Sequence, residues 1–451
     1  MATVNSAWTV APGYEAVRDA FVAGSGSLGY GGGAYCAYVN GQPVVDLWGG
    51  DAAPGRPWQE QTTTVLMSAT KGFAVLCMQI LVERGQIDVD APVATYWPEF
   101  AANGKEGVLV RHLLMHTAGV IGFDGMHNVV RHDATGWDDY EGIAAGLAAS
   151  APSFPPGTTH CYHALTIGWL FGEIVRRVDG RTLGRFFAEE VAGPLGLEAW
   201  VGTPDAELGR AAQVRTMRLE HLPSLLRKMQ ETYLAAARRP ETLAGRAFLG
   251  DGTQSGVDVL ELIFNSPAVL RAEFPAGGGT ATARGMAKLW AAMAHGGELD
   301  GVRILKPDTV DAWGHVVSRQ PDQMLVSLEV PRLLRGIAKA PLPRTLGYLG
   351  NTAIPGIGYR FGPNPEAFGA EGLGGQFGFC DRQSNIAVGF VRSELAVIDV
   401  LQAGMTNVLY DCARHAGLDV YTPPKKSLPG RAGDRALGGY MRRRVAVPAP
   451  V

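Results

Sequence analysis

A serine and a lysine stand three positions apart inside a long, mostly apolar run. The run covers residues 65–82, and Ser68 and Lys71 lie near its start. Residues three apart lie on one face of a helix, so the two side chains can share a pocket. A helix that is apolar on nearly every face is expected to be buried, where a solvated lysine does not belong. The pattern therefore predicts a core helix over residues 65–84 that carries a polar pair.

The chemistry of this pair favours nucleophilic catalysis. A serine hydroxyl attacks poorly unless a neighbouring base takes its proton. An amine in an apolar wall can lose its charge and act as that base. The alternative is a serine cap with a solvated lysine, because a chain of this length contains on the order of one such spacing by chance. The apolar flanks of Ser68 and Lys71 favour the catalytic interpretation.

Other motifs follow the pair in a fixed order. They are ERGQIDVDAPV at 83–93, VRHLLMHTAGV at 110–120, PGTTHCYHA at 156–164, GGELDG at 296–301 and FGAEGLGGQFGF at 368–379. With these motifs the chain resembles the serine β-lactamase and penicillin-binding-protein superfamily, especially its class C-like, family VIII carboxylesterase branch. The resemblance extends from about residue 15 to 415. Each motif is loose, but the set in this order is specific.

The resemblance implies an α/β, β-lactamase-like fold with an antiparallel sheet flanked by helices and an inserted all-helical lobe. It implies Ser68 as the nucleophile and Lys71 with Tyr162 as the general base. Both groups have an ordinary pKa near 10, so burial and proximity must lower at least one of them. Backbone N–H groups of Ser68 and Leu373 would hold the oxyanion. The implied substrate-binding residues are His163, Glu371, Gly372 and Gly374.

Two positions depart from the family's motifs. Ala164 replaces an asparagine that would bind a substrate amide and steady the lysine. Ala370, followed by Glu371, replaces a cation that helps to bind the carboxylate of β-lactams. Lost attraction and added repulsion should disfavour a carboxylate, which favours neutral esters. The alternative is that another cation, such as Arg360 or Arg382, fills the gap.

The order of predicted elements indicates one catalytic unit over residues 1–420. Its α/β part covers about 10–80 and 280–415, and its helical lobe covers about 85–280, with a possible lid at 201–272. Asn40-Gly41 between two apolar runs predicts a hairpin over 31–50. Helices are expected at 12–23, 140–150, 164–178, 182–193, 283–296 and 397–415, and a strand at 385–391. Residues 421–451 form a basic, proline-containing tail.

Composition and smaller motifs exclude several other classes. A net charge of −3 gives no reason to expect nucleic acid or an anionic membrane as partner. The start of the chain lacks a signal-peptide pattern, and the five scattered cysteines suit reduced core thiols, so a cytoplasmic location is expected. His112 and His116 have helical spacing, but Leu113 stands where a zinc protease needs glutamate, so no metal is expected. The glycines at 24–29 follow a predicted helix and precede a strand, which disfavours a nucleotide loop, and no cofactor is expected.

The leading hypothesis is a serine carboxylesterase acting on a small ester through an acyl-enzyme. An acyltransferase or an amide or peptide hydrolase could use the same site. A β-lactamase or D-amino-peptidase is a second alternative. A non-catalytic binding relic is a third, which Ala164 and Ala370 favour and the survival of Ser68, Lys71 and Tyr162 opposes.

Overall fold

The central feature of the fold is an antiparallel sheet built from both ends of the chain. The computed structural model describes residues 7–29, 31–216, 224–328, 339–354, 358–395 and 401–422. Its largest sheet has the order β1-β3-β2-β16-β15-β14-β11, with β4 paired to β3. The strands are β1 (Thr9–Val10), β2 (Gly32–Val39), β3 (Gln42–Ala53), β4 (Arg56–Pro57), β11 (Leu349–Gly350), β14 (Phe368–Glu371), β15 (Phe377–Asp381) and β16 (Ile386–Arg392). The predicted strand at 385–391 is therefore confirmed as β16.

The predicted hairpin over residues 31–50 is also present. Strands β2 and β3 pair antiparallel and are joined at Asn40 and Gly41, which have φ angles of 50° and 73°. Positive φ at both turn positions is the geometry that favours Asn-Gly in two-residue hairpins. Strand β2 then pairs with β16, so that Cys36 lies opposite Gly389. The N-terminal hairpin is thus joined to the C-terminal strands at the middle of the sheet.

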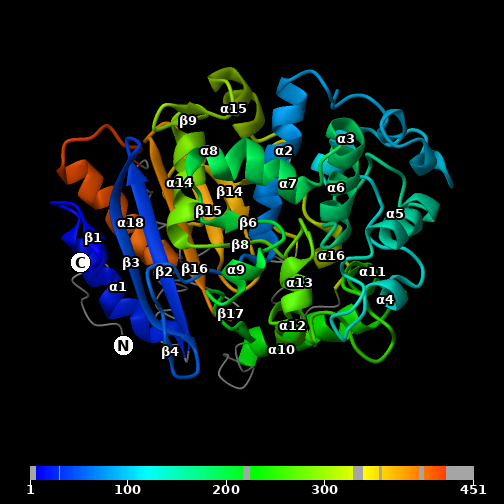
Figure 1. Ribbon diagram of the computed structural model, residues 1–451, viewed down its shortest axis with the longest axis horizontal. Coiled ribbons are helices and arrows are strands. Elements are labelled where there is room, and N and C mark those ends of the chain that lie inside the picture. Colours follow the sequence, from blue (N-terminus) through cyan, green and yellow to red (C-terminus); the bar gives the residue numbers. More distant parts are fainter. Residues whose placement is uncertain are drawn as a thin grey trace.

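Helices cover both faces of this sheet. Helix α14 (Ala283–Ala294) packs on β2, β15 and β16 (Figure 1). The approach is close, because a Cβ on Gly389 would lie 2.4 Å from the Ala283 carbonyl oxygen. Helices α1 (Glu15–Gly24) and α18 (Leu401–His415) pack against each other, and Tyr35 of β2 reaches Thr406 of α18 at 3.4 Å. Helices α14 and α18 fall within the predicted ranges, and α1 ends one residue beyond the predicted range 12–23.

The chain between residues 66 and 279 contributes a series of helices, most of which lie on one side of the molecule (Figure 1). The helices are α2 (Lys71–Glu83), α3 (Val110–Leu114), α4 (Met126–Val129), α5 (Tyr140–Ala149), α6 (Thr166–Asp179), α7 (Leu183–Phe187), α8 (Gly193–Leu195), α9 (Asp205–Leu208), α10 (Ser224–Arg238), α11 (Leu243–Ala247), α12 (Leu260–Phe264) and α13 (Pro267–Arg271). The helix expected at 182–193 is interrupted, since a π-helical turn at Ala188–Ala192 separates α7 from α8.

Short strands join this helical region to the rest of the molecule. Strand β6 (Ala199–Trp200) pairs with β8 (Thr280–Ala281), which also pairs with β5 (Thr64–Val65) just before Ser68. Strand β7 (Arg215–Thr216) pairs with β17 (Glu394–Leu395). The region is therefore not wholly helical, and its strands attach it to segments at both ends of the chain.

Several smaller expectations can be compared with the structure. The five cysteines are free and buried, as expected of core thiols. Residues 25–28 form a 3₁₀ turn between α1 and β2, so the glycine pattern there does not lie between a strand and a helix. Among the described residues no helix is long and apolar enough to cross a bilayer, and no group of three metal-ligating side chains is present. The predicted tail lies outside the described residues, apart from its first two positions.

Candidate active site

Ser68 is placed on a tight turn that leads directly into α2. The turn, Met67–Thr70, is 3₁₀-helical, and Met67 has a φ of 49°, which is uncommon for a residue with a side chain. The Thr70 hydroxyl donates to the Met67 carbonyl at 2.7 Å and accepts from the Gly279 N–H at 3.1 Å. Every residue from 62 to 81 except Ser68 is buried. The turn therefore presents one hydroxyl to the surface from an otherwise buried segment.

Lys71 points its amine at this hydroxyl. The Lys71 Nζ lies 3.1 Å from Ser68 Oγ and 2.8 Å from each of the carbonyl oxygens of Ala164 and Ala276. The side chain is buried, and this burial, with a smaller contribution from the charge of Arg344, holds the pKa of Lys71 well below its usual value. The backbone of Ala164 thus steadies the amine where the sequence lacks the family's asparagine side chain.

Tyr162 completes the cluster around Ser68. Its ring centroid lies 4.8 Å from Lys71 Nζ. Burial raises the pKa of Tyr162, while a hydrogen bond with Ser68 and the charge of Arg344 act in the opposite direction. The Tyr162 backbone N–H donates to Asp322 Oδ1 at 3.2 Å, which fixes the loop that carries the ring. The structure therefore brings the three predicted catalytic side chains together.

Strand β14 and the glycines after it pass directly beside the nucleophile. A Cβ on Gly372 would lie 2.1 Å from the Leu66 carbonyl oxygen and 3.0 Å from Ser68 N. Leu373 follows, and its side chain is 46% exposed although it is large and apolar. The backbone at 372–373 and the Ser68 N–H thus lie on one side of the site. The oxyanion hole from Ser68 and Leu373 remains a prediction that this placement supports.

Three further predicted residues have different surroundings. Glu371 forms an ion pair with Arg360, which follows β13 (Gly358–Tyr359). Gly374 has a φ of 95° and packs on β17, where a Cβ would meet Leu395 at 2.4 Å. His163 is fully buried, and its Nδ1 is 2.7 Å from the Cys161 carbonyl. Gly374 and His163 therefore support neighbouring backbone rather than line the accessible surface near Ser68.

Buried histidines surround the Tyr162 loop. His116 Nδ1 accepts from the His163 N–H at 3.0 Å, and the His116 ring lies 5.1 Å from the ring of Tyr162. Burial lowers the pKa of His116 and His160, and lowers the pKa of His163 to about 4. These rings are therefore neutral at physiological pH. His116 braces the loop through this hydrogen bond, and His112 Nδ1 likewise accepts from the Leu109 N–H at 3.2 Å.

Sequence reasoning did not identify an ion pair that lies next to Tyr162. Arg344 Nη2 is 3.1 Å from Asp322 Oδ2, and both side chains are buried. The Arg344 guanidinium lies 5.9 Å from the Tyr162 ring centroid. Neither residue belongs to a recognisable motif, so no sequence signal marked them. The Ala276 carbonyl was also missed, although the run of glycines at 277–279 indicates close backbone contact.

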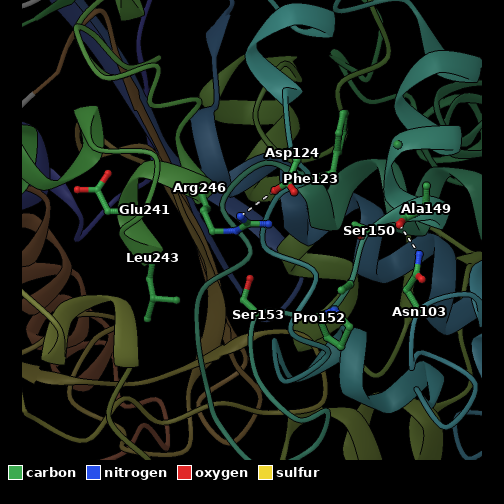
Figure 2. Close-up of a pocket in the computed structure, with 12 residues that line it drawn as sticks. Asn103, Phe123, Asp124, Ala149, Ser150, Pro152, Ser153, Glu241, Leu243 and Arg246 are labelled. Carbon is green, nitrogen blue, oxygen red and sulfur yellow. Dashed lines mark hydrogen bonds and ion pairs between the residues drawn. The ribbon is translucent and has the colours of Figure 1, made fainter.

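A separate cavity of about 660 Å³ lies beside α5 and α11 (Figure 2). Arg246 and Asp124, 3.0 Å apart, form an ion pair at this cavity. Ser68, Lys71 and Tyr162 do not line it. Leu243 lines the cavity and also packs on the buried cluster that contacts Tyr162. The cavity therefore lies next to the buried cluster on which Tyr162 packs, but Ser68 does not line it.

The fold and this constellation define a serine hydrolase with a β-lactamase-like architecture. The chain belongs to the beta-lactamase family, whose family model matches residues 17–395. This confirms the family and fold expected from the motifs.

Known proteins of related sequence and structure agree with this assignment. The chain is 34% identical over 389 residues to the esterase/beta-lactamase LipL of Mycobacterium tuberculosis, with 85% of this chain and 82% of LipL covered. A crystal structure of a family VIII carboxylesterase is 32% identical with a TM-score of 0.73, and 90% of this chain and 98% of that chain are covered. A penicillin-binding protein homologue from Caulobacter crescentus is 31% identical, with the same TM-score and coverage.

Proposed function

We propose that the protein is a serine carboxylesterase that forms an acyl-enzyme on Ser68. The observation that carries this proposal is the set of contacts made by the Lys71 amine. A neutral amine has two N–H donors and one lone pair. In this form the carbonyls of Ala164 and Ala276 can accept from the two donors, which leaves the lone pair for the hydroxyl of Ser68, whose Oγ is 3.1 Å away. Burial favours this neutral form.

The reaction then proceeds by two acyl transfers. Lys71 takes the proton of Ser68 while Oγ attacks the ester carbonyl carbon, and the carbonyl oxygen becomes an oxyanion between the backbone N–H groups of Ser68 and Leu373. The oxyanion collapses, the bond to the alkoxy oxygen breaks, and the proton passes to the leaving alcohol through Lys71 and Tyr162. Water repeats the sequence on the acyl-enzyme and releases the acid. An alcohol in place of water gives acyl transfer from the same intermediate.

Hydrolysis of β-lactams is a second candidate. The name of LipL joins esterase and beta-lactamase, and the ion pair between Arg360 and Glu371 offsets the repulsion that Glu371 would exert on an anionic substrate. The residue at position 370 argues against this candidate, because it is an alanine and not a cation. The Ala370 side chain is buried against α2, since a Cβ on Gly72 would lie only 2.9 Å from Ala370 Cβ. Neutral esters therefore remain the favoured substrates.

The proposal is tested by intact-mass analysis after brief incubation with p-nitrophenyl butyrate. We expect one butyryl adduct on the wild-type protein and none on Ser68→Ala. Thr70→Ser is the matched control, because it keeps the hydroxyl that braces the turn. An adduct of equal occupancy on Ser68→Ala would overturn the proposal, and so would a wild-type protein that neither forms an adduct nor releases p-nitrophenol.

A further inference from the structure

The most informative feature outside the catalytic cluster is the buried pair of Arg344 and Asp322. The side chains are 7% and 3% exposed, and the separation of 3.1 Å makes this a direct ion pair. A buried charge is costly unless it is paired and hydrogen-bonded, so a fold keeps such a pair only where other interactions support it. Asp322 is well supported, because its Oδ1 accepts from the backbone N–H groups of Tyr162 and Met324.

The backbone of Arg344 is held as firmly as its side chain. Arg344 exchanges hydrogen bonds with Ser318, at 2.9 Å and 3.2 Å, and forms a second bridge with Leu349 of β11. Strand β11 in turn pairs with β14, which ends at Glu371 beside the nucleophile. The guanidinium is therefore attached to the edge of the main sheet, while Asp322 attaches it to the loop of Tyr162.

Arg344 and Lys71 contact the same aromatic ring. The Tyr162 centroid lies 4.8 Å from Lys71 Nζ and 5.9 Å from the Arg344 guanidinium carbon. Arginine stays protonated at any pH at which the protein is folded, so its charge is fixed. A fixed positive charge at this range disfavours a second one on the amine and favours negative charge on the phenol oxygen.

We infer that Arg344 is a positioning residue that supplies a fixed positive charge to this site, held by Asp322 next to Tyr162, and that, together with burial, it keeps Lys71 neutral and ready to accept the Ser68 proton. The inference rests on the proposed function. Arg344 thus supplies a positive charge where Ala370 provides no cation, but from the segment before β11 and from a position beside the Tyr162 ring. It acts through Lys71 and Tyr162 rather than on the substrate.

Other titratable groups face Lys71, Tyr162 and Arg344, and we do not expect them to change charge in the pH range in which Lys71 and Tyr162 titrate. These groups are His116 after α3, His160, Cys161 and His163 before α6, and Tyr233 on α10. The pKa values of the histidines are lowered by burial, and burial raises the pKa of Cys161 to about 12 and raises that of Tyr233. The carboxylates of Asp322 and Glu371 are paired with Arg344 and Arg360. We expect kcat/KM to rise with pH as Lys71 and Tyr162 lose their shared proton, and we assign this expected rise to these two groups.

Substitutions of the two partners of the ion pair should shift the pH midpoint of kcat/KM in opposite directions. Arg344→Met removes a positive charge, so protonated Lys71 becomes more stable and the midpoint of kcat/KM moves to higher pH. Asp322→Asn removes a negative charge and keeps an oxygen for the Tyr162 N–H, so the midpoint moves to lower pH. A loss of packing alone would lower the maximum rate in both variants without opposite shifts.

The experiment measures kcat/KM for p-nitrophenyl butyrate from pH 6 to 9.5, corrected for spontaneous hydrolysis. We expect Arg344→Met to raise the midpoint by at least about half a unit, which is roughly a threefold loss of rate well below the midpoint. Arg344→Lys should restore most of the wild-type profile. Arg284→Met is the matched control, because Arg284 also pairs with a buried aspartate, Asp46, at 2.6 Å.

A double variant covers the case in which Arg344→Met does not fold. Arg344→Met with Asp322→Asn leaves no unpaired buried charge, and its midpoint should still lie above that of the wild type. An unchanged midpoint in folded Arg344→Met or in the folded double variant, or shifts of the same sign in Arg344→Met and Asp322→Asn, would overturn the inference. In that case a butyryl adduct on Ser68 of the wild-type protein would still support the proposed function. A wild-type protein that neither forms the adduct nor releases p-nitrophenol would instead overturn the proposed function.

Discussion

Gly372 lies against the backbone of Ser68, with no room for even a single methyl group between them. A Cβ on Gly372 would approach the Leu66 carbonyl oxygen to 2.1 Å, a distance that real Cβ atoms do not show. Since neither partner is a flexible side chain, a larger residue must move the strand or the nucleophile turn. The contact therefore sets the spacing between Ser68 and the N–H groups predicted to bind the oxyanion.

We expect Gly372→Ala to lower kcat for p-nitrophenyl butyrate about a hundredfold or more, which is the usual effect of losing one oxyanion donor. The KM should change much less, because the substrate still reaches the site. Gly404→Ala is the matched control, since no atom lies within 4 Å of its Cβ position. Equal activities of the two variants would show that the contact does not set the geometry of the site.

Lys71 and Tyr162 are expected to act as one unit. Lys71→Ala and Tyr162→Phe should each reduce kcat/KM by orders of magnitude, and the double variant should be little worse than either, because both groups serve one proton transfer. Steady-state kinetics of the four proteins, with circular dichroism to check folding, measures this. Multiplicative losses would instead assign separate roles to the two residues.

The stability of the protein should fall in mild acid because of its buried histidines. The folded-state pKa of His163 is lowered to about 4, so the unfolded chain binds more protons between pH 6.5 and pH 4. The contribution of His163 to the free energy of unfolding is then highest above pH 6.5. It decreases by on the order of 3 kcal/mol as the pH falls toward 4. Urea unfolding at pH 7.5 and pH 5 measures the difference.

His163→Asn should reduce this pH dependence, because its amide can still donate to the Cys161 carbonyl but does not titrate. His315→Asn, at an exposed position, should leave it unchanged. If both variants lose stability between pH 7.5 and pH 5 as the wild type does, other groups cause the acid sensitivity.

Neutral esters should be preferred to β-lactams. We expect kcat/KM for p-nitrophenyl butyrate to exceed that for nitrocefin at least about a hundredfold, a discrimination of under about 3 kcal/mol. Arg360→Met should widen this ratio, because it leaves the charge of Glu371 unpaired near an anionic substrate. Comparable values for the two substrates would contradict the argument from Ala370.

The predicted lid at 201–272 can be tested at Tyr233. This residue of α10 packs with Phe248 at 5.7 Å between ring centroids, and both contact the cluster that supports Tyr162. We expect Tyr233→Ala to raise KM for p-nitrophenyl octanoate severalfold and to change KM for the acetate little. Equal effects on both esters would argue that the segment does not contact the acyl chain.

The parts of the structure that depend on local sequence could be predicted well. Asn40-Gly41 defined a hairpin because its turn chemistry is local, and the burial of Lys71 followed from its apolar neighbours. The contacts of Lys71 with the Ala164 and Ala276 carbonyls could not be predicted, because every residue type has the same backbone carbonyl and the sequence does not show which of them accepts a hydrogen bond. The pair of Arg344 and Asp322 was missed because it depends on how a stretch without motifs packs on the sheet.

The pairing of β2 with β16 has a consequence for the synthesis of the protein. Strand β2 ends at Val39 and its partner β16 begins at Ile386, so the centre of the sheet joins segments that leave the ribosome far apart in time. Until the second segment emerges, one edge of the β2–β3 hairpin remains unpaired, and such edges invite association with other chains. We therefore expect nascent chains that stop before residue 386 to depend on chaperones, and the catalytic turn to acquire its final form only near the end of translation.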